Sequence, residues 1–261
     1  MKNNDIITKI AICFVLVPIV LIVLPYLISP IISEKYGQMT VDLIIFLVAI
    51  VLSQNIWHIK ISFLSLKKPL SQLCQLIPSI LFLLFTRFST LSSMSFRLID
   101  ARIILTVLFI ALAEESVYRG LLIPLSLVFT KNKQYTAIVI SGVGFALAHL
   151  VNIVNSPWSI VMLQMLIVFA SGLLWGTLYL KTNNLSLTIM LHFLDDLPLF
   201  LMKETSELVT PTRPQLISAI MAYLIVVGII GIITFLQVEG LHLVDCKINP
   251  NAVRTKKISF L

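Results

Sequence analysis

Charged residues are scarce in this sequence. Of its 261 residues, 12% are charged and 58% are hydrophobic. A soluble domain carries about twice that charged fraction, and no single soluble core could bury so much apolar surface. The composition therefore excludes an ordinary soluble domain and predicts an all-α fold, a polytopic bundle of membrane helices.

Cysteine is equally sparse. Cys13, Cys74 and Cys246 lie far apart, with the spacing of neither a disulfide framework nor a metal site. The net charge of +7 comes from basic residues that gather in short connecting loops, and no segment resembles a nucleic-acid-binding module. We therefore expect a lipid bilayer around the protein and no nucleic-acid partner.

Long hydrophobic runs make up most of the sequence. A transmembrane helix needs about 20 mainly apolar residues. The first run is too long for a signal-peptide core and has no cleavage site, so we expect it to be retained. The seventh contains Pro198, which would kink or end it. We expect eight transmembrane helices, at residues 8–32, 39–57, 72–90, 98–129, 134–153, 158–180, 185–202 and 215–237.

No linker, repeat or low-complexity tract divides the chain, which predicts one integral membrane domain. Residues 1–97 form its N-terminal helices, residues 98–202 a core that carries most of the intramembrane ionisable groups, and residues 203–261 the last helix and a basic tail. If the N-terminus is cytoplasmic, the helix ends on its side carry roughly twice as many basic residues as the opposite ends. Both termini are therefore expected in the cytoplasm.

Two shorter features predict local structure. The segment 57–71 mixes apolar residues with three lysines, which is typical of either an amphipathic stretch along the cytoplasmic interface or an ordinary solvated loop. Gly172 and Gly176 form a GxxxG pair in the sixth span, which allows close helix approach. We expect packing within one molecule there rather than dimerisation.

A set of seven ionisable residues lies well inside three of the apolar spans. A charged side chain at bilayer depth costs several kcal/mol by insertion scales, so such residues usually face a cavity and have a function. Their position on three separate spans predicts one polar pocket between helices. The residues are Glu114, Glu115, Arg119, His149, His192, Asp195 and Asp196.

The spacing within each span places these residues on common helix faces. Glu115 and Arg119 are four residues apart, in the favourable order of acid before base, so one carboxylate is neutralised. Glu114 lies about 100° away around the helix and is free to act as a general base. His192 and Asp196 are also four apart, and an aspartate in that position can orient the ring.

The three motifs together resemble the CPBP family of intramembrane proteases, named for CAAX proteases and bacteriocin-processing enzymes and also called the Abi family. That family has EExxxR, then FxxxH, then HxxxN or HxxxD, on separate membrane helices. The resemblance covers about residues 105–200. The matching residues here are Glu114, Glu115 and Arg119, then Phe145 and His149, then His192 and Asp196.

The resemblance implies a role for each residue. Glu114 would activate a water, His149 would help to hold it, and His192 with Asp196 would stabilise the oxyanion. Glu115, Arg119 and Phe145 would support the site geometry. Many family members have Asn in place of Asp196. Since an ionised Asp cannot donate a hydrogen bond, Asp196 would either be protonated or orient His192.

The expected chemistry needs no cofactor, although two histidines and a glutamate make zinc an alternative. The sequence lacks HExxH, which would preorganise zinc, and GxSxG, the motif of a serine nucleophile. An aspartyl mechanism would need an aspartate on another span, and none was identified as a good candidate. We therefore expect no metal.

The predicted function is an intramembrane endopeptidase that cleaves a peptide or a membrane-anchored protein by glutamate-activated water. A bacterial plasma membrane and a role in bacteriocin processing or immunity fit the resemblance, with a peptide or membrane-protein substrate as partner. One alternative is a non-catalytic membrane partner that binds without cutting. Another is a small transporter that uses the same groups as a proton relay.

Overall fold

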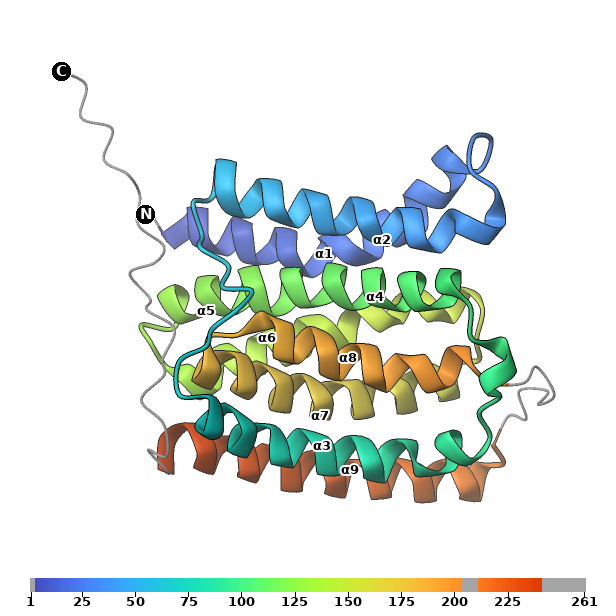
Figure 1. Ribbon diagram of the computed structural model, residues 1–261. Helices are drawn as coiled ribbons and strands as arrows, with labels where there is room; N and C mark the ends of the chain where they lie inside the picture. The colour runs from blue at the N-terminus through green and yellow to red at the C-terminus, as the bar shows by residue number, and fades with distance from the viewer. Residues whose placement is uncertain (1–2, 203–210, 241–261) are drawn as a thin grey trace.

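A computed structural model describes residues 3–202 and 211–240 of the protein (Figure 1). Within these ranges it contains helices and no named strand, which confirms the all-α prediction. The helices are α1 (Asn3–Ile28), α2 (Glu34–Val51), α3 (Pro69–Ser92), α4 (Ala101–Glu115), α5 (Ile123–Phe129), α6 (Gln134–Ala148), α7 (Trp158–Thr182), α8 (Leu185–Phe200) and α9 (Arg213–Phe235).

Short π and 3₁₀ segments extend or join these helices. The π segments η1 (Leu52–Ile56) and η5 (Leu236–Gly240) follow α2 and α9, and the 3₁₀ segment η4 (His149–Val154) follows α6. The π segment η3 (Ser116–Leu122) joins α4 to α5. Because α4, η3 and α5 are continuous, the described chain forms eight helical rods, as expected. The separate 3₁₀ turn η2 is Phe96–Leu98.

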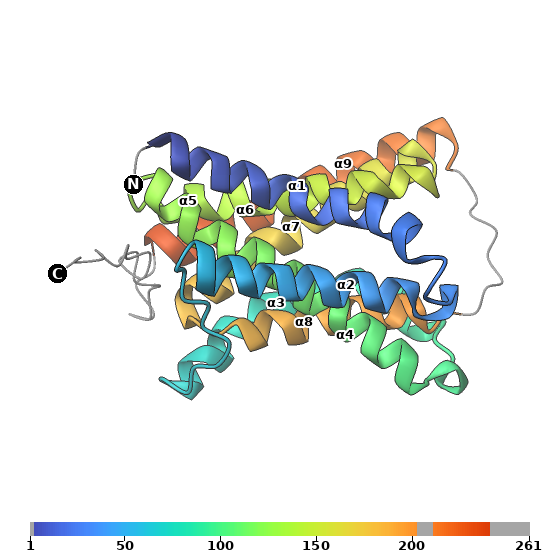
Figure 2. The same cartoon turned by 90° about the horizontal axis from the view of Figure 1, so that it is seen from above.

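The rods run side by side and alternate in direction. In Figure 1, α1 and α2 form one outer layer, α3 and α9 form the opposite one, and the remaining helices lie between them. Figure 2 shows the same bundle from above, with the α1–α2 connector at the end away from the N-terminus. The last 21 residues of the sequence, which hold most of the predicted basic tail, lie outside the described ranges.

Six of the rods are long and apolar enough to cross a membrane: α1, α2 with η1, α3, α6 with η4, α7, and α9 with most of η5. The other two are the α4–η3–α5 rod, which carries several charges, and α8, which has only 16 residues. These two rods are the ones that hold both carboxylate pairs. Burial inside the bundle, away from lipid, explains how they tolerate so much charge.

The connector from α2 to α3 has no regular secondary structure between residues 58 and 66. Part of it packs into the bundle, since Trp57 and Ile59 are buried. The carbonyls of Ser62 and Phe63 accept hydrogen bonds from the backbone N–H groups of Leu185 and Ser186, at 2.9 and 2.8 Å. The first N–H groups of a helix have no acceptor within the helix. Here the carbonyl groups of the connector act as acceptors and fix the start of α8.

Small residues let α6 and α7 approach each other closely. A Cβ atom added to Gly172 would lie 3.1 Å from the Cα of Gly142, and one added to Gly176 would lie 3.1 Å from Cγ2 of Ile138. The GxxxG pair therefore packs within the molecule, as predicted. This contact aligns α6, which carries the FxxxH motif, with α7, which lines part of the cavity described below.

Candidate active site

The carboxylate pair lies where α4 changes into a π segment. Glu114 and Glu115 are the last two residues of α4, and η3 carries Arg119. Single π turns inside α-helices are frequent at functional sites because they shift the direction of the side chains that follow. Every residue of η3 is buried, so this stretch lies in the centre of the bundle.

Glu115 is held by two partners. Its Oε1 lies 3.1 Å from Nη1 of Arg119 and 3.0 Å from Nδ1 of His192. Glu115 and Arg119 have no exposed surface. The guanidinium carbon of Arg119 also lies 4.2 Å from the centre of the Phe145 ring, a cation–π contact. Glu115 is therefore the neutralised carboxylate of the pair, as the i, i+4 spacing predicted.

Glu114 has no arginine partner. Its Oε2 lies 3.7 Å from Nε2 of His192, which is too long for a direct hydrogen bond. Among the described residues this oxygen has no hydrogen-bond partner, although the residue is 8% exposed. A buried carboxylate oxygen without a donor is costly, so this oxygen can accept a hydrogen bond from a water or a substrate. Glu114 thus has the environment of a free acid–base group.

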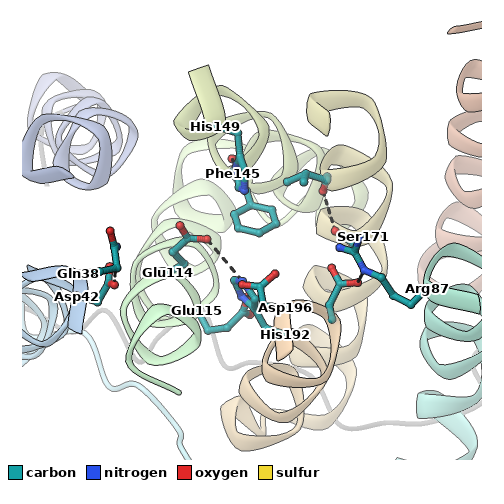
Figure 3. A network of polar contacts seen from close by, with 12 residues as sticks. Gln38, Asp42, Arg87, Glu114, Glu115, Phe145, His149, Ser171, His192 and Asp196 are labelled. Atoms are coloured by element: carbon teal, nitrogen blue, oxygen red, sulfur yellow. Dashed lines mark hydrogen bonds and ion pairs between the residues drawn. The ribbon is translucent and has the colours of Figure 1, made fainter. Parts of the chain in front are cut away.

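His192 stands at the centre of the cluster (Figure 3). Its Nδ1 faces Glu115, and its Nε2 lies 3.3 Å from Oδ2 of Asp196. The ring of Trp175 packs against it in a tilted arrangement, with 5.1 Å between centres and 32° between planes. Carboxylates at both nitrogens fix the ring in its plane, and the tryptophan covers one face. Asp196 therefore lies where it can orient the His192 ring, which is one of the two roles that the family resemblance implies.

His149 lies at the end of α6, where that helix turns into η4. Its Nδ1 donates to the carbonyl oxygen of Phe145 at 2.9 Å, which leaves Nε2 as an acceptor. The Phe145 ring is within 5.1 Å of the His149 ring and 5.6 Å of the His192 ring, measured between centres. Phe145 thus separates and positions the two histidines.

A cavity of about 470 Å³ adjoins these groups. His149, His192 and Asp196 line it on one side, and apolar side chains of α7 such as Ile167 and Val168 line it on another. In Figure 3, His192 and Asp196 lie between Glu114 and the part of the wall near Ser171 and Arg87. Phe145 and His149 of the FxxxH motif and His192 and Asp196 of α8 thus line the cavity, whereas Glu114 of α4 is not among its lining residues and lies 3.7 Å from His192.

Arg87 and Asp195 form a second ion pair at this cavity. Nε of Arg87 lies 2.6 Å from Oδ1 of Asp195 and links α3 to α8. Asp195 was predicted to lie near the site, whereas no role was predicted for Arg87. The signal was present, since a lone arginine in an apolar span marks a buried partner.

A further acid on α2 was also missed. Asp42 is 2% exposed, and its Oδ2 accepts a hydrogen bond from Nε2 of Gln38 at 2.7 Å. In Figure 3 both residues lie on the side of Glu114 away from His192. Asp42 is thus a buried aspartate on another span, and its printed hydrogen bond is to Gln38 rather than to Asp195 or Asp196. The signal was a single Asp in the second apolar run.

The described residues contain no group of three or more His, Cys, Asp or Glu side chains arranged to hold a metal ion. The nitrogens of His192 already face Glu115 and Asp196, so the ring makes ion-pair contacts at both. The donor set that made zinc an alternative is thus not assembled as one site in this geometry.

The site is thus an intramembrane cluster of two carboxylate pairs and two histidines beside a cavity. Residues 96–197 match the protein family described as type II CAAX prenyl endopeptidase Rce1-like. This match confirms the resemblance found in the motifs, and the matched residues include all three of them. No curated protein and no solved structure matches the chain.

Proposed function

We propose that this protein cleaves a peptide bond with a water activated by Glu114. The observation that carries the proposal is the contrast between the two neighbouring carboxylates. Glu115 is neutralised by Arg119, whereas Oε2 of Glu114 has no donor among the described residues and lies 3.7 Å from His192. A positioned general base next to a hydrogen-bond donor is the minimum for amide hydrolysis without a covalent nucleophile.

In the proposed reaction, a water lies between Glu114 and His149. Glu114 takes one proton from it as the oxygen attacks the substrate carbonyl carbon, and the C=O electron pair becomes an oxyanion. Nε2–H of His192, which faces Asp196 at 3.3 Å before the reaction, donates to that oxyanion while Glu115 holds Nδ1 of the ring. Glu114 then passes its proton to the amide nitrogen as the C–N bond breaks. Atoms and charge balance, because the water supplies both the hydroxyl and the proton of the products.

The supporting residues keep this geometry rigid. Glu115 fixes Nδ1 of His192 at 3.0 Å, and Arg119 holds Glu115 while it packs on Phe145. Such outer contacts matter because a misplacement of about 1 Å at the reacting atoms costs about 100-fold in rate. In this proposal Glu115, Arg119 and Phe145 are positioning residues rather than catalytic ones.

The proposed substrate is a peptide or a membrane-anchored protein, and the proposed setting is a bacterial plasma membrane with both termini in the cytoplasm. A role in the processing of bacteriocin-like peptides, or in immunity to them, fits the family resemblance. Zinc remains the rival chemistry. Chelator treatment of the purified protein, followed by added Zn²⁺, separates the two, since a glutamate mechanism predicts unchanged cleavage in both steps.

The decisive variant is Glu114→Gln, which keeps the size of the side chain and removes the base. Removal of a general base costs about 10²- to 10⁴-fold, so cleavage of a quenched fluorescent peptide library by the reconstituted protein should fall at least about 100-fold. The matched control is Glu34→Gln, a change at an exposed acid in the first turn of α2. Wild-type cleavage by Glu114→Gln would remove the proposed mechanism, whereas no cleavage by the wild-type protein itself would favour the binding-only alternative.

A further inference from the structure

We propose that the active-site cavity opens on the extracytoplasmic side of the membrane, so that cleavage follows translocation or membrane insertion of the substrate. That a substrate is cleaved in this cavity rests on the proposed function, whereas the side of the membrane on which the cavity opens does not. The inference combines the position of the cavity along the bundle with the distribution of lysines between its two ends.

The cavity occupies the half of the bundle away from the N-terminus. Arg87 lies near the end of α3, Leu199 is the second-last residue of α8, and Ile160 is in the first turn of α7. These helix ends meet at the side of the bundle opposite the N-terminus (Figure 1). The connector from α6 to α7 adds Asn152 and Ser156 to the wall.

The mouth at this connector is polar. Nδ2 of Asn152 donates to Oε1 of Gln164 at 2.9 Å, and both residues line the cavity. From there the wall continues inward along α7 to Trp175, which packs against His192. The hollow therefore leads from a hydrophilic rim to the candidate catalytic groups.

The opposite end of the same helices is closed. Every residue of α7 from Ala170 to Thr182 is buried. Beyond α7, Nδ2 of Asn184 donates to Oε1 of Gln72 at 2.9 Å and to the carbonyl of Ser65 at 3.1 Å. A peptide arriving from that end would have to separate packed helices and break this hydrogen-bonded cluster.

The distribution of basic residues between the two ends of the bundle indicates which end faces the cytoplasm. The two longer connectors at the N-terminal end carry five lysines: Lys60, Lys67, Lys68, Lys131 and Lys133. The α6–α7 connector at the cavity mouth, HLVNIVNSP, carries no lysine or arginine. The other segments on its side contain five basic residues, Lys35, Arg97, Arg102, Lys203 and Arg213, whereas Lys9 and Lys181 raise the number at the N-terminal end to seven. Since short cytoplasmic loops are enriched in basic residues, the N-terminal end is cytoplasmic and the mouth lies outside.

This arrangement restricts the substrate. The peptide bond must be presented from the outer leaflet or the outer aqueous phase, as in a peptide that has been exported or a membrane protein that has already been inserted. A modified tail that stays on the cytoplasmic surface would meet the closed end. The reaction that supplies the substrate is therefore a translocation or insertion step.

Cysteine accessibility tests the sidedness directly. In a background with Cys74→Ser and Cys246→Ser, we expect Ser156→Cys at the mouth to react with a membrane-impermeant maleimide in intact bacterial cells. The matched variant Leu66→Cys lies in the α2–α3 connector, where Leu66 is 80% exposed, and should react only after the cells are permeabilised. The reverse pattern would overturn the proposal.

A second pair tests whether the mouth leads into the cavity. Ile167 lines the cavity, whereas Met165 lines an apolar groove on a different face of α7. A small charged thiosulfonate added outside should therefore modify Ile167→Cys and leave Met165→Cys unmodified. An Ile167→Cys variant that reacts only from the cytoplasmic side, or not at all, would contradict the inference.

These labelling results do not depend on catalysis, so they separate the two proposals. Each cysteine variant should label identically when combined with Glu114→Gln. If wild-type protein cuts no peptide but Ser156→Cys labels from outside, the protease mechanism fails and the sidedness stands. If the protein cuts peptides but Ser156→Cys labels only from the cytoplasm, the mechanism stands and the sidedness fails.

Discussion

The ion pair between Arg87 and Asp195 should stabilise the bundle measurably, because it joins two helices far apart in sequence. Its atoms are 2.6 Å apart, and the side chains are 20% and 10% exposed. The perturbation is a double-mutant cycle of Arg87→Met, Asp195→Asn and the combined variant. Both changes keep roughly the shape of the side chain and remove its charge.

The magnitude follows from distance and environment. Two unit charges about 4 Å apart attract by roughly 4 kcal/mol at an effective dielectric constant of about 20. Part of this is offset by desolvation, and the cavity on one side screens the pair. Arg87→Met also leaves Asp195 without its cation beside Asp196. We therefore expect each single variant to lose about 2–4 kcal/mol of unfolding free energy, with a coupling energy of about 1.5–3 kcal/mol.

Titration with SDS in mixed micelles, followed by far-UV circular dichroism, measures these free energies. The matched control is the exposed pair of Arg102 and Asp100, 3.4 Å apart with side chains 35% and 49% exposed. Arg102→Met with Asp100→Asn should couple by less than about 1 kcal/mol, since exposed ion pairs contribute little and Asn still caps the helix. If the Arg87–Asp195 cycle is equally weak, the reasoning about this wall of the cavity is refuted.

Two further predictions concern packing. Gly172→Ala should destabilise the protein by about 1–3 kcal/mol in the same titration, because its Cβ would lie 3.1 Å from backbone at Gly142, whereas Gly228→Ala has open space and should be neutral or stabilising. Trp175→Ala should lower the cleavage rate more than it lowers stability, because it frees one face of His192; a loss of rate that only tracks loss of fold would contradict this.

Much of the candidate site could be predicted from the sequence because helical spacing is a local property. Glu115 and Arg119 pair at i, i+4 as expected, and so do His192 and Asp196. The apolar runs around them predicted the helices, and the cost of ionisable groups in lipid predicted that they face one another. The match over residues 96–197 covers all three motifs.

Other contacts could not be predicted, because they join residues that lie far apart in the sequence. Arg87 and Asp195 are 108 positions apart, and nothing in the local pattern of either residue identifies the other. Trp175 sits in an apolar run like many other core residues, and only packing sets its ring beside His192. The path of the α2–α3 connector likewise follows from its bonds to α8 rather than from its own composition.

The sequence by itself determined that this protein is a bundle of membrane helices and which residues share each helix face. Hydropathy and the 3.6-residue period act over a few turns of one chain segment, so both can be seen without a structure. The tertiary structure alone decided how the two carboxylates differ: Glu115 meets Arg119 and His192 closely, whereas Oε2 of Glu114 has no hydrogen-bond partner among the described residues and lies 3.7 Å from His192. That difference depends on which helices pack together, because the energy of a buried charge is set by its neighbours in space.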